Sequence, residues 1–339
     1  MVSALVALAH RLVNIPSLSG EEAEAARFVA AHLADLGYVV EVFEAAPGRP
    51  NVLATTDRPP RVVLSTHLDT VPPHLPAREE PGFLCGRGAC DAKGIIAAQI
   101  TAAERLRGEG VDEIGLLFVV DEEMGSAGAR AANAHPRARE CRWLIDGEPT
   151  DNKLAAGSKG SLRLTLRTEG VTAHSAYPEQ GRSAIDPLLD VLADVRRTPW
   201  PTDSFFGDTT LNIGVIAGGS RPNVVAGDAR ADLQIRLVTD AAPVKQLLEQ
   251  TVGGRARIEY LTAVNPVRLT TVPGFETCVV RFTTDIPHLA NWGAPLLIGP
   301  GSILDAHTAH ERISLEELAA GADAYVRLAC ALLGGNGAP

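Results

Sequence analysis

The sequence predicts a two-domain α/β protein, in which a mostly parallel-sheet domain is interrupted by a smaller α+β domain. Apolar strand-like segments alternate with helical segments over residues 1–154, which is typical of a sheet covered on both faces. From 155 to 268 the order changes to β-α-β-β-α-β, as in ferredoxin-like domains, and over 269–339 the first pattern resumes. A chain of 339 residues is also more typical of two domains than of one.

The elements of the larger domain follow from hydrophobic periodicity. The segment 1–20 is amphipathic, with Leu5, Leu8 and Leu12 on one face, and predicts a helix. Further helices are predicted over 21–38, 92–110 and 314–335, and strands over 39–45, 61–70, 114–120, 141–149 and 294–301. In the insertion, strands are predicted over 160–170, 209–219, 229–238 and 255–263, and helices over 182–197 and 241–254.

Composition excludes several classes of partner. The net charge of −10 argues against nucleic acid, because phosphate binding needs clustered cations. No apolar run approaches the roughly 18 residues that span a bilayer, so we expect no membrane segment. The N-terminus lacks a basic leader and a small-residue cleavage site, and reads as a helix rather than a signal peptide.

The cysteines indicate a reducing compartment. Their number is odd, they are scattered, and they form no C-x-x-C pair; they are Cys85, Cys90, Cys141, Cys278 and Cys330. This spacing suits neither a disulfide framework nor a zinc finger. We therefore expect a cytoplasmic protein.

An apolar strand runs directly into Asp121, Glu122 and Glu123. A solvated strand end is the simpler explanation. The alternative is a bound cation, since packed carboxylates are unfavourable unless a positive charge compensates them.

Other predicted strand ends carry the same residue types. They hold His67 with Asp69, Asp146 with Glu148, and His307, while Asp91 lies among glycines at the start of a helix. Ligands of open α/β sheets bind at the carboxyl ends of the strands, so these side chains can converge. Mixed histidine and carboxylate ligands favour Zn²⁺, Mn²⁺ or Co²⁺ over Ca²⁺ or Mg²⁺. Asp69 can accept the second ring N–H of His67, because alternate strand residues share a face.

Each of these signals has a simpler explanation when taken alone. A lone His-x-Asp is mostly structural, and adjacent glutamates are mostly solvated. The segment "GRGACDAKG" (86–94) could be a phosphate-binding turn, but it lacks the third glycine of G-x-G-x-x-G and the Gly-Lys-Ser/Thr of a P-loop. The combination is the stronger signal.

Five segments in order resemble peptidase family M20, the dinuclear-metal amidohydrolases. The family includes acetylornithine deacetylases, succinyl-diaminopimelate desuccinylases, aminoacylases and carboxypeptidase G. The matching segments are "STHLDTVP" (65–72), "GRGACDAKG" (86–94), "VVDEEMGSAGA" (119–129), "DGEPT" (146–150) and "GPGSILDAH" (299–307). The resemblance covers nearly the whole chain and implies a catalytic α/β domain with an inserted lid or dimerisation domain.

The resemblance also implies roles for these residues. Asp91 would bridge two metal ions, with His67 and Glu148 completing one site and Glu123 and His307 the other. Glu122 would be the general base, and Asp69 would support His67. Zn²⁺ is the favoured ion, with Co²⁺ or Mn²⁺ as alternatives. Asp121 would point away, and Asp146 and His310 are the weaker candidates for ligand positions.

The insertion carries three further candidates. His174, in a segment similar to the family's H-S-x-x-P-x-x-G-x-x-A, would stabilise the oxyanion in the partner subunit's active site, which implies a homodimer through the inserted domain. Asn223 would contact substrate, and Arg236 would anchor a carboxylate unless it is a surface cation. Ser183 and Ala226 depart from the family pattern, where Asn and Pro are frequent.

The resemblance implies hydrolysis of the amide bond of an N-acyl-L-amino acid, most similar to acetylornithine deacetylase. Alternatives are release of lysine or ornithine from a carrier protein, desuccinylation, and dipeptide hydrolysis. A non-catalytic amino-acid-binding relative would have lost the base or a ligand, yet every position is filled. A nucleotide-binding Rossmann enzyme is disfavoured by the missing glycine fingerprint and by the acids, which would repel phosphate.

Overall fold

The computed structural model describes residues 2–334, which divide into two compact units. Unit 1 comprises the described residues up to Ala156, then Leu269–Cys278, then those from Thr284 onward; unit 2 comprises Gly157–Arg268 and Val279–Thr283. Met1 and Gly335, at the outer ends of the two predicted terminal helices, lie outside the described residues. No helix within residues 2–334 is long and apolar enough to cross a membrane.

Unit 1 is built on a six-stranded sheet in the order β1-β2-β6-β3-β7-β17. Its strands are β1 (Val39–Ala46), β2 (Arg49–Thr55), β3 (Val62–His67), β6 (Ile114–Val119), β7 (Trp143–Asp146) and β17 (Ala294–Leu297). Its helices are α1 (Val2–Asn14), α2 (Ala23–Asp35), α3 (Lys93–Gly108), α4 (Ala127–Asn133) and α7 (Leu315–Gly334). β6, β3, β7 and β17 run parallel, whereas β2 pairs antiparallel with both β1 and β6. The α/β class predicted from the sequence is confirmed.

The remaining elements are short. They are the strands β4 (Arg78–Glu80), β5 (Phe83–Cys85), β8 (Leu154–Ser158), β15 (Val267–Arg268), β16 (Thr277–Val280) and β18 (Arg312–Ser314), and the 3-10 turns Pro136–Glu140, Pro178–Gln180, Ile286–His288 and Ala290–Trp292.

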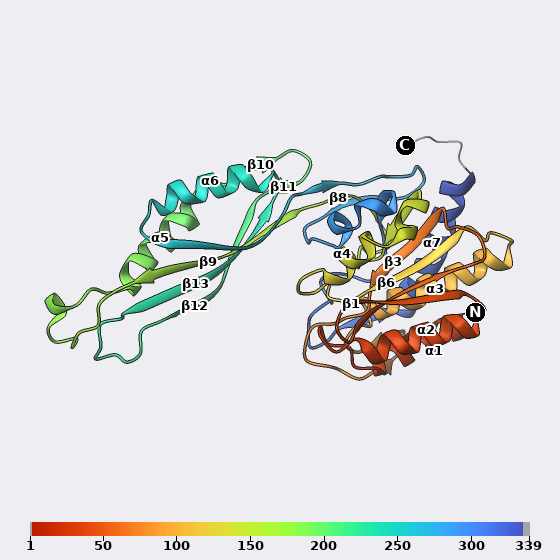
Figure 1. Cartoon of the computed structure of the whole chain (residues 1–339), viewed down its shortest axis with the longest axis horizontal. Helices are drawn as coiled ribbons and strands as arrows, with labels where there is room; N and C mark the ends of the chain where they lie inside the picture. The colour runs from red at the N-terminus through yellow and green to blue at the C-terminus, as the bar shows by residue number, and fades with distance from the viewer. Residues whose placement is uncertain (1, 335–339) are drawn as a thin grey trace. The chain divides into compact units, whose positions relative to one another are not determined.

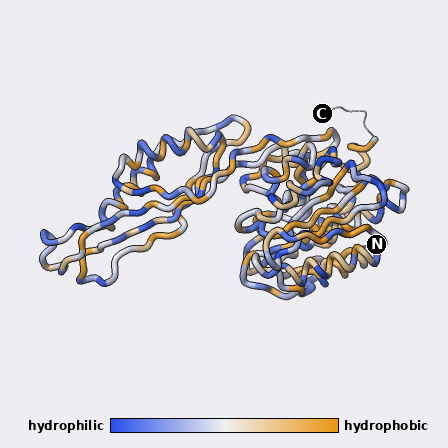
Figure 2. The backbone as a smooth tube through the Cα atoms, in the orientation of Figure 1, coloured by the Kyte–Doolittle hydropathy of each residue, from blue (hydrophilic) through white to orange (hydrophobic). Residues whose placement is uncertain are grey.

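The central strands are apolar on both faces because the sheet separates two cores. In β6, Leu116 and Phe118 pack into the core formed with α1, α2, α3 and α7, while Leu117 packs into the core beneath α4. The same alternation holds along β3. Figure 2 shows these strands as mostly hydrophobic. A strand buried on both faces reads as a continuous apolar run, which is why the sequence predicts β3 and β6 well.

β2 is the one strand of the six-stranded sheet that the sequence analysis does not predict. It forms a hairpin with β1, and Gly48 in the turn has φ +74°, a conformation that favours glycine. The strand begins Arg49-Pro50, and a proline at a strand start weakens the sequence signal.

Unit 2 is a four-stranded antiparallel sheet covered by two helices. The strand order is β12-β13-β9-β14, formed by β9 (Gly160–Glu169), β12 (Thr210–Gly218), β13 (Asp228–Leu237) and β14 (Arg257–Val264). The helices are α5 (Ile185–Arg197) and α6 (Ala241–Val252), which lie on one face of the sheet (Figure 1), and a small ribbon joins β10 (Thr202–Asp203) to β11 (Gly207–Asp208). This is the β-α-β-β-α-β order of the ferredoxin-like fold.

The alternation predicted for β9 is visible in its burial. Leu162, Leu164 and Leu166 are buried beneath the helices, whereas Arg163 and Arg167 are exposed. A strand with one covered face needs this period of two.

Candidate metal centre

A cluster of acids and histidines lies at the carboxyl ends of the parallel strands of unit 1. His67 is the last residue of β3, Glu122 and Glu123 follow β6, and Glu148 follows β7. Asp91 precedes α3, and His307 lies in the loop after β17. Parallel strands end at a common edge, which is why residues from 67 to 307 meet there.

Asp91 lies between two groups of side chains. Its Oδ1 is 3.0 Å from His67 Nε2, and its Oδ2 is 3.3 Å from His307 Nε2. Glu123 Oε1 lies 2.8 Å from His307 Nε2, and Glu148 Oε1 lies 4.0 Å from His67 Nε2. One carboxylate therefore faces a histidine and an acid on each side, an arrangement suited to bridging two cations.

Burial makes this cluster unfavourable without a compensating positive charge. His67, Asp91 and Glu148 are all at most 5% exposed. Burial, together with the charges of Glu122 and Asp91, raises the pKa of Glu148 well above its ordinary value. Ligand atoms of His67, Glu122 and Glu148, and those of His67, Asp91 and Glu123, lie within 4.8 Å of one another. The mixed nitrogen and oxygen donors fit divalent transition ions.

The histidines and acids of the cluster shift one another's pKa values. Hydrogen bonds to Asp91 and Glu123 raise the pKa of His307 to about 10. Burial alone would raise the pKa of Asp91, but hydrogen bonds from His307 and His67 hold it below its usual range. A cation bound here would displace protons from these rings.

Asp69 acts differently from the sequence expectation. The backbone carbonyl of Asp69, not its carboxylate, accepts the Nδ1–H of His67 at 2.9 Å, while the nearer carboxylate oxygen is 3.6 Å away. A carbonyl can only accept, so this contact favours the tautomer that leaves Nε2 free for a ligand. The carboxylate instead accepts from Ser19 Oγ (2.7 Å) and from the backbone N–H groups of Glu122 (3.1 Å) and Glu123 (3.2 Å). Asp69 therefore fixes the two glutamates as well as His67.

The side chains of Glu122 and Asp121 lie in different surroundings. Burial raises the pKa of Glu122 well above its ordinary value, and the charges of Asp285 and Glu123 add to this. Asp121 has φ +71°, forms an ion pair with Arg49 Nη1 at 2.8 Å, and accepts from the backbone N–H of Ala127 at 3.1 Å. Asp121 is thus directed to the start of α4.

The two weaker ligand candidates, Asp146 and His310, differ in burial. Asp146, the last residue of β7, is 2% exposed, and its pKa is raised well above normal by burial and by the charge of Asp285. His310 is exposed. Neither belongs to the two ligand groups found among the described residues, and nor does His307, whose Nε2 lies 2.8 Å from Glu123 and 3.3 Å from Asp91.

The candidates of the insertion belong to unit 2. His174 is exposed, its Nδ1 accepts from the N–H of Ala176 at 3.1 Å, and its segment pairs with that of Val224. The carbonyl of Asn223 accepts from Ser175 N at 3.0 Å, so His174 and Asn223 lie on neighbouring segments. Arg236 is half-buried on β13. Their roles toward the metal centre stay predictions.

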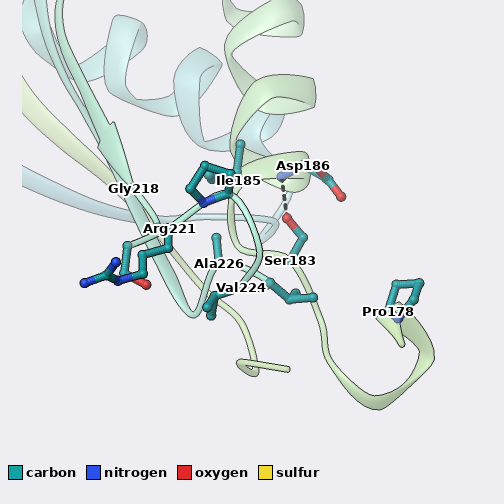
Figure 3. A pocket seen from close by; sticks show the side chains of 12 residues that line it. Pro178, Ser183, Ile185, Asp186, Gly218, Arg221, Val224 and Ala226 are labelled. Atoms are coloured by element: carbon teal, nitrogen blue, oxygen red, sulfur yellow. Dashed lines mark hydrogen bonds between the residues drawn. The ribbon is translucent and has the colours of Figure 1, made fainter. Parts of the chain in front are cut away.

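A cavity of about 660 Å³ lies beside these segments (Figure 3). Ser183 and Ala226, the two departures from the family pattern, both line it, together with Arg221 and Val224. Ser183 Oγ accepts from the N–H of Asp186 at 3.3 Å, at the start of α5. Both differences from the family pattern therefore lie in the lining of this cavity in unit 2.

Two residues near the centre are missed by the sequence analysis. Glu311 is 1% exposed and binds the backbone around Asp91, and Asp285 is 2% exposed among the acids of the cluster. Glu311 follows His307 by four residues, and Asp285 ends the segment "FTTD". Neither carries a local pattern that distinguishes it from a surface acid.

The fold and the cluster define the class of protein as a two-unit α/β protein with a candidate metal centre at the carboxyl ends of its parallel strands. A metallo-carboxypeptidase of the M20 family from Sulfolobus solfataricus shares this fold, with a TM-score of 0.77 over 95% of this chain and 97% of that chain. The two sequences are 17% identical, so the likeness concerns the fold alone.

The chain belongs to peptidase family M20/M25/M40, which matches residues 63–331. It is 36% identical over 335 residues to a peptidase M20 domain-containing protein of Schizosaccharomyces pombe, covering 96% of this chain and 84% of the relative. It is also 36% identical over 375 residues to a probable carboxypeptidase of Aspergillus clavatus, covering 98% of this chain and 83% of the relative. The resemblance stated from the motifs is confirmed, and the protein is an enzyme that hydrolyses amide bonds.

Proposed function

We propose that this enzyme hydrolyses the amide bond of an N-acylated L-amino acid, as acetylornithine deacetylases do, with two divalent metal ions at the cluster around Asp91. The observation that carries the proposal is the position of Asp91, whose two oxygens lie 3.0 Å and 3.3 Å from His67 and His307. Membership of peptidase family M20/M25/M40 and the mixed histidine and carboxylate ligand groups also support metal use.

The chain's own residues have separate tasks in this proposal. His67 and Glu148 would hold one ion, Glu123 and His307 would hold the other, and Asp91 would serve both. Two such ions would supply a water of lowered pKa and polarise the amide oxygen. Glu122 accepts the proton of the attacking water and delivers it to the leaving amine nitrogen. Its raised pKa, caused by burial and neighbouring acids, favours acceptance of the proton from the attacking water.

A carboxypeptidase or dipeptidase is the second candidate. Its amide also has an amino acid with a free carboxylate on the amine side, and only the acyl group differs. The naming of the Aspergillus clavatus relative as a probable carboxypeptidase favours this reading. A carrier-protein conjugate of lysine or ornithine, or an N-succinyl substrate, would differ in the same acyl group.

The inserted unit supports a proposed homodimer. β12 is an edge strand of its sheet, and it exposes Val215 and Ile216. An open edge with exposed apolar side chains is suited to pairing with a second copy. In such a dimer, His174 would reach the reacting carbonyl of the partner subunit, and Asn223 and Arg236 would contact the substrate.

The proposed ion is Zn²⁺, and the proposed compartment is the cytoplasm. The histidine and carboxylate donors suit Zn²⁺ and also Co²⁺ or Mn²⁺. The five cysteines are unpaired within residues 2–334, which suits a reducing compartment.

The test is amine release from N-acetylornithine, N-acetylcitrulline, N-acetyllysine, N-succinyl-diaminopimelate and a dipeptide, after chelation and after return of Zn²⁺ or Co²⁺. Metal-dependent release from an N-acetyl amino acid supports the deacetylase, and release from the dipeptide alone supports the peptidase. No bound metal and no turnover would contradict the proposal.

Adjacent glutamates offer a matched pair of variants. Glu122→Gln should lower kcat by about 10²–10⁴-fold and retain both ions, as expected for a general base. Glu123→Gln should instead lose metal at one site. An unchanged kcat in Glu122→Gln would remove Glu122 from the role of base.

A further inference from the structure

We propose that Glu311 is a positioning residue that sets the bridging carboxylate of Asp91 and couples it to the loop of His307. The proposal rests on the proposed metal centre and concerns a residue outside the ligand set. In this proposal, Glu311 and its ion-pair partner Arg87 fix the relative positions of the three loops that carry the proposed metal ligands.

The contacts of Glu311 converge on the loop of Asp91. Its Oε1 accepts from the backbone N–H groups of Gly88 (2.8 Å), Cys90 (3.2 Å) and Asp91 (3.2 Å). Its backbone carbonyl accepts from Gly86 N at 3.0 Å. Three N–H groups directed at one carboxylate oxygen form charge-assisted hydrogen bonds, which fix the backbone more firmly than neutral ones. The orientation of Asp91 therefore depends on a residue that lies 220 positions further along the chain.

Arg87 extends this connection to a third loop. Its Nη1 lies 2.5 Å from Glu311 Oε2, and both side chains are at most 2% exposed. Arg87 Nε donates to Pro73 O at 3.3 Å, and its backbone N–H donates to Leu75 O at 2.9 Å. The segment that contains Pro73 and Leu75 follows His67. One buried ion pair thus joins the loops that carry His67, Asp91 and His307.

Glycine at position 88 permits the backbone conformation next to this ion pair. Gly88 has φ +88°, and a Cβ at this position would lie 2.8 Å from the side chain of Lys93. A residue with a side chain at this position would displace the backbone N–H that donates to Glu311 Oε1. Next to Glu311, Arg312 of β18 pairs with Cys85 of β5, which holds the two segments together.

Loss of Glu311 should therefore act on both metal ions at once. Asp91 faces both His67 (3.0 Å) and His307 (3.3 Å), so a shift of its backbone changes both of the proposed ion sites. Residues that orient metal ligands through hydrogen bonds are worth about 10–100-fold in metal affinity. A residue that only stabilised the fold would lower thermal stability and leave the affinity of the folded protein unchanged.

The experiment compares metal binding by the full chain and two variants at Glu311. Glu311→Gln keeps an oxygen for the backbone N–H groups but removes the charge beside Arg87. Glu311→Asp keeps the charge, so that the protein folds, but withdraws the oxygen from the N–H groups. Glu22→Gln is the matched control, because Glu22 is 0% exposed and ion-paired with Arg49 but contacts no segment that carries Asp91 or His307 among the described residues.

Metal-free protein is titrated with Co²⁺, followed by calorimetry and by the visible absorption of the bound ion. We expect both Glu311 variants to bind Co²⁺ about 10–100-fold more weakly with a changed spectrum, and Glu22→Gln to bind as the wild type does. Wild-type affinity and spectrum in both Glu311 variants would overturn the positioning role. Absence of Co²⁺ binding by the wild type would instead overturn the proposed metal centre.

Discussion

Replacement of Asp121 by alanine should destabilise the protein without removing the metal ions. Asp121 stands directly before Glu122 and is only 7% exposed. Its side chain nevertheless contacts Arg49 and the backbone N–H of Ala127 rather than the ligand cluster. The variant therefore tests whether three consecutive acids divide into one structural residue and two functional ones.

The magnitude follows from three contacts. Loss of the hydrogen bond to Ala127 N at the start of α4 costs about 1 kcal/mol. The φ of +71° suits Asp but not Ala, which costs about 1–2 kcal/mol. Arg49 loses one of two acidic partners and keeps Glu22, so about 1 kcal/mol is lost there. The sum is roughly 3–4 kcal/mol for Asp121→Ala, and Asp121→Asn, which keeps an acceptor and tolerates this φ, should lose only about 1 kcal/mol.

Urea unfolding of the metal-free protein, followed by circular dichroism, measures both variants. Metal content and kcat are measured on the metal-loaded forms and should stay within a few-fold of the wild type. If Asp121→Ala were as stable as the wild type, or if it lost metal at unchanged stability, the division of roles described here would be wrong.

The remaining predictions concern the metal cluster and the inserted unit. Burial raises the pKa of Asp285 from 3.8 to about 7, so the native state binds more protons than the unfolded state between these values and loses stability as the pH rises. Asp285→Asn should remove this loss and gain on the order of 4 kcal/mol over the wild type at pH 8 but little at pH 4, in urea unfolding of metal-free protein. Asp91→Ala should lower occupancy at both metal sites by elemental analysis, and two fully occupied sites would disprove bridging. His174→Ala should lower kcat while metal content stays unchanged, and an unaffected kcat would weaken the case for an obligate dimer.

The sequence predicts those parts of the fold that local pattern determines. β3 and β6 are continuous apolar runs, and β9 alternates, so their burial can be inferred from a few adjacent residues. β2 is missed because its signal lies in a short hairpin rather than in its own composition.

At the metal centre, too, the sequence predicts residues that stand in local motifs and misses contacts that depend on the folded chain. His67, Asp91 and Glu123 can be named because each stands in a motif, whereas the bond of His67 to the Asp69 carbonyl depends on the backbone path after β3. Glu311 could not be predicted, because its importance arises from contacts with residues more than 200 positions away. No local pattern records such a contact.

The place of the insertion has a consequence for chain entropy. β17 pairs with β7 along Trp143–Asp146, although the chain between these neighbouring strands includes all of unit 2. Closing a loop becomes more unfavourable with its length, by about 0.6 kcal/mol for each doubling. Unit 2 has its own core, so its compaction shortens the effective span between β7 and β17. Formation of unit 2 therefore favours the strand pairing that completes the sheet edge from which Glu148 and the His307 loop extend.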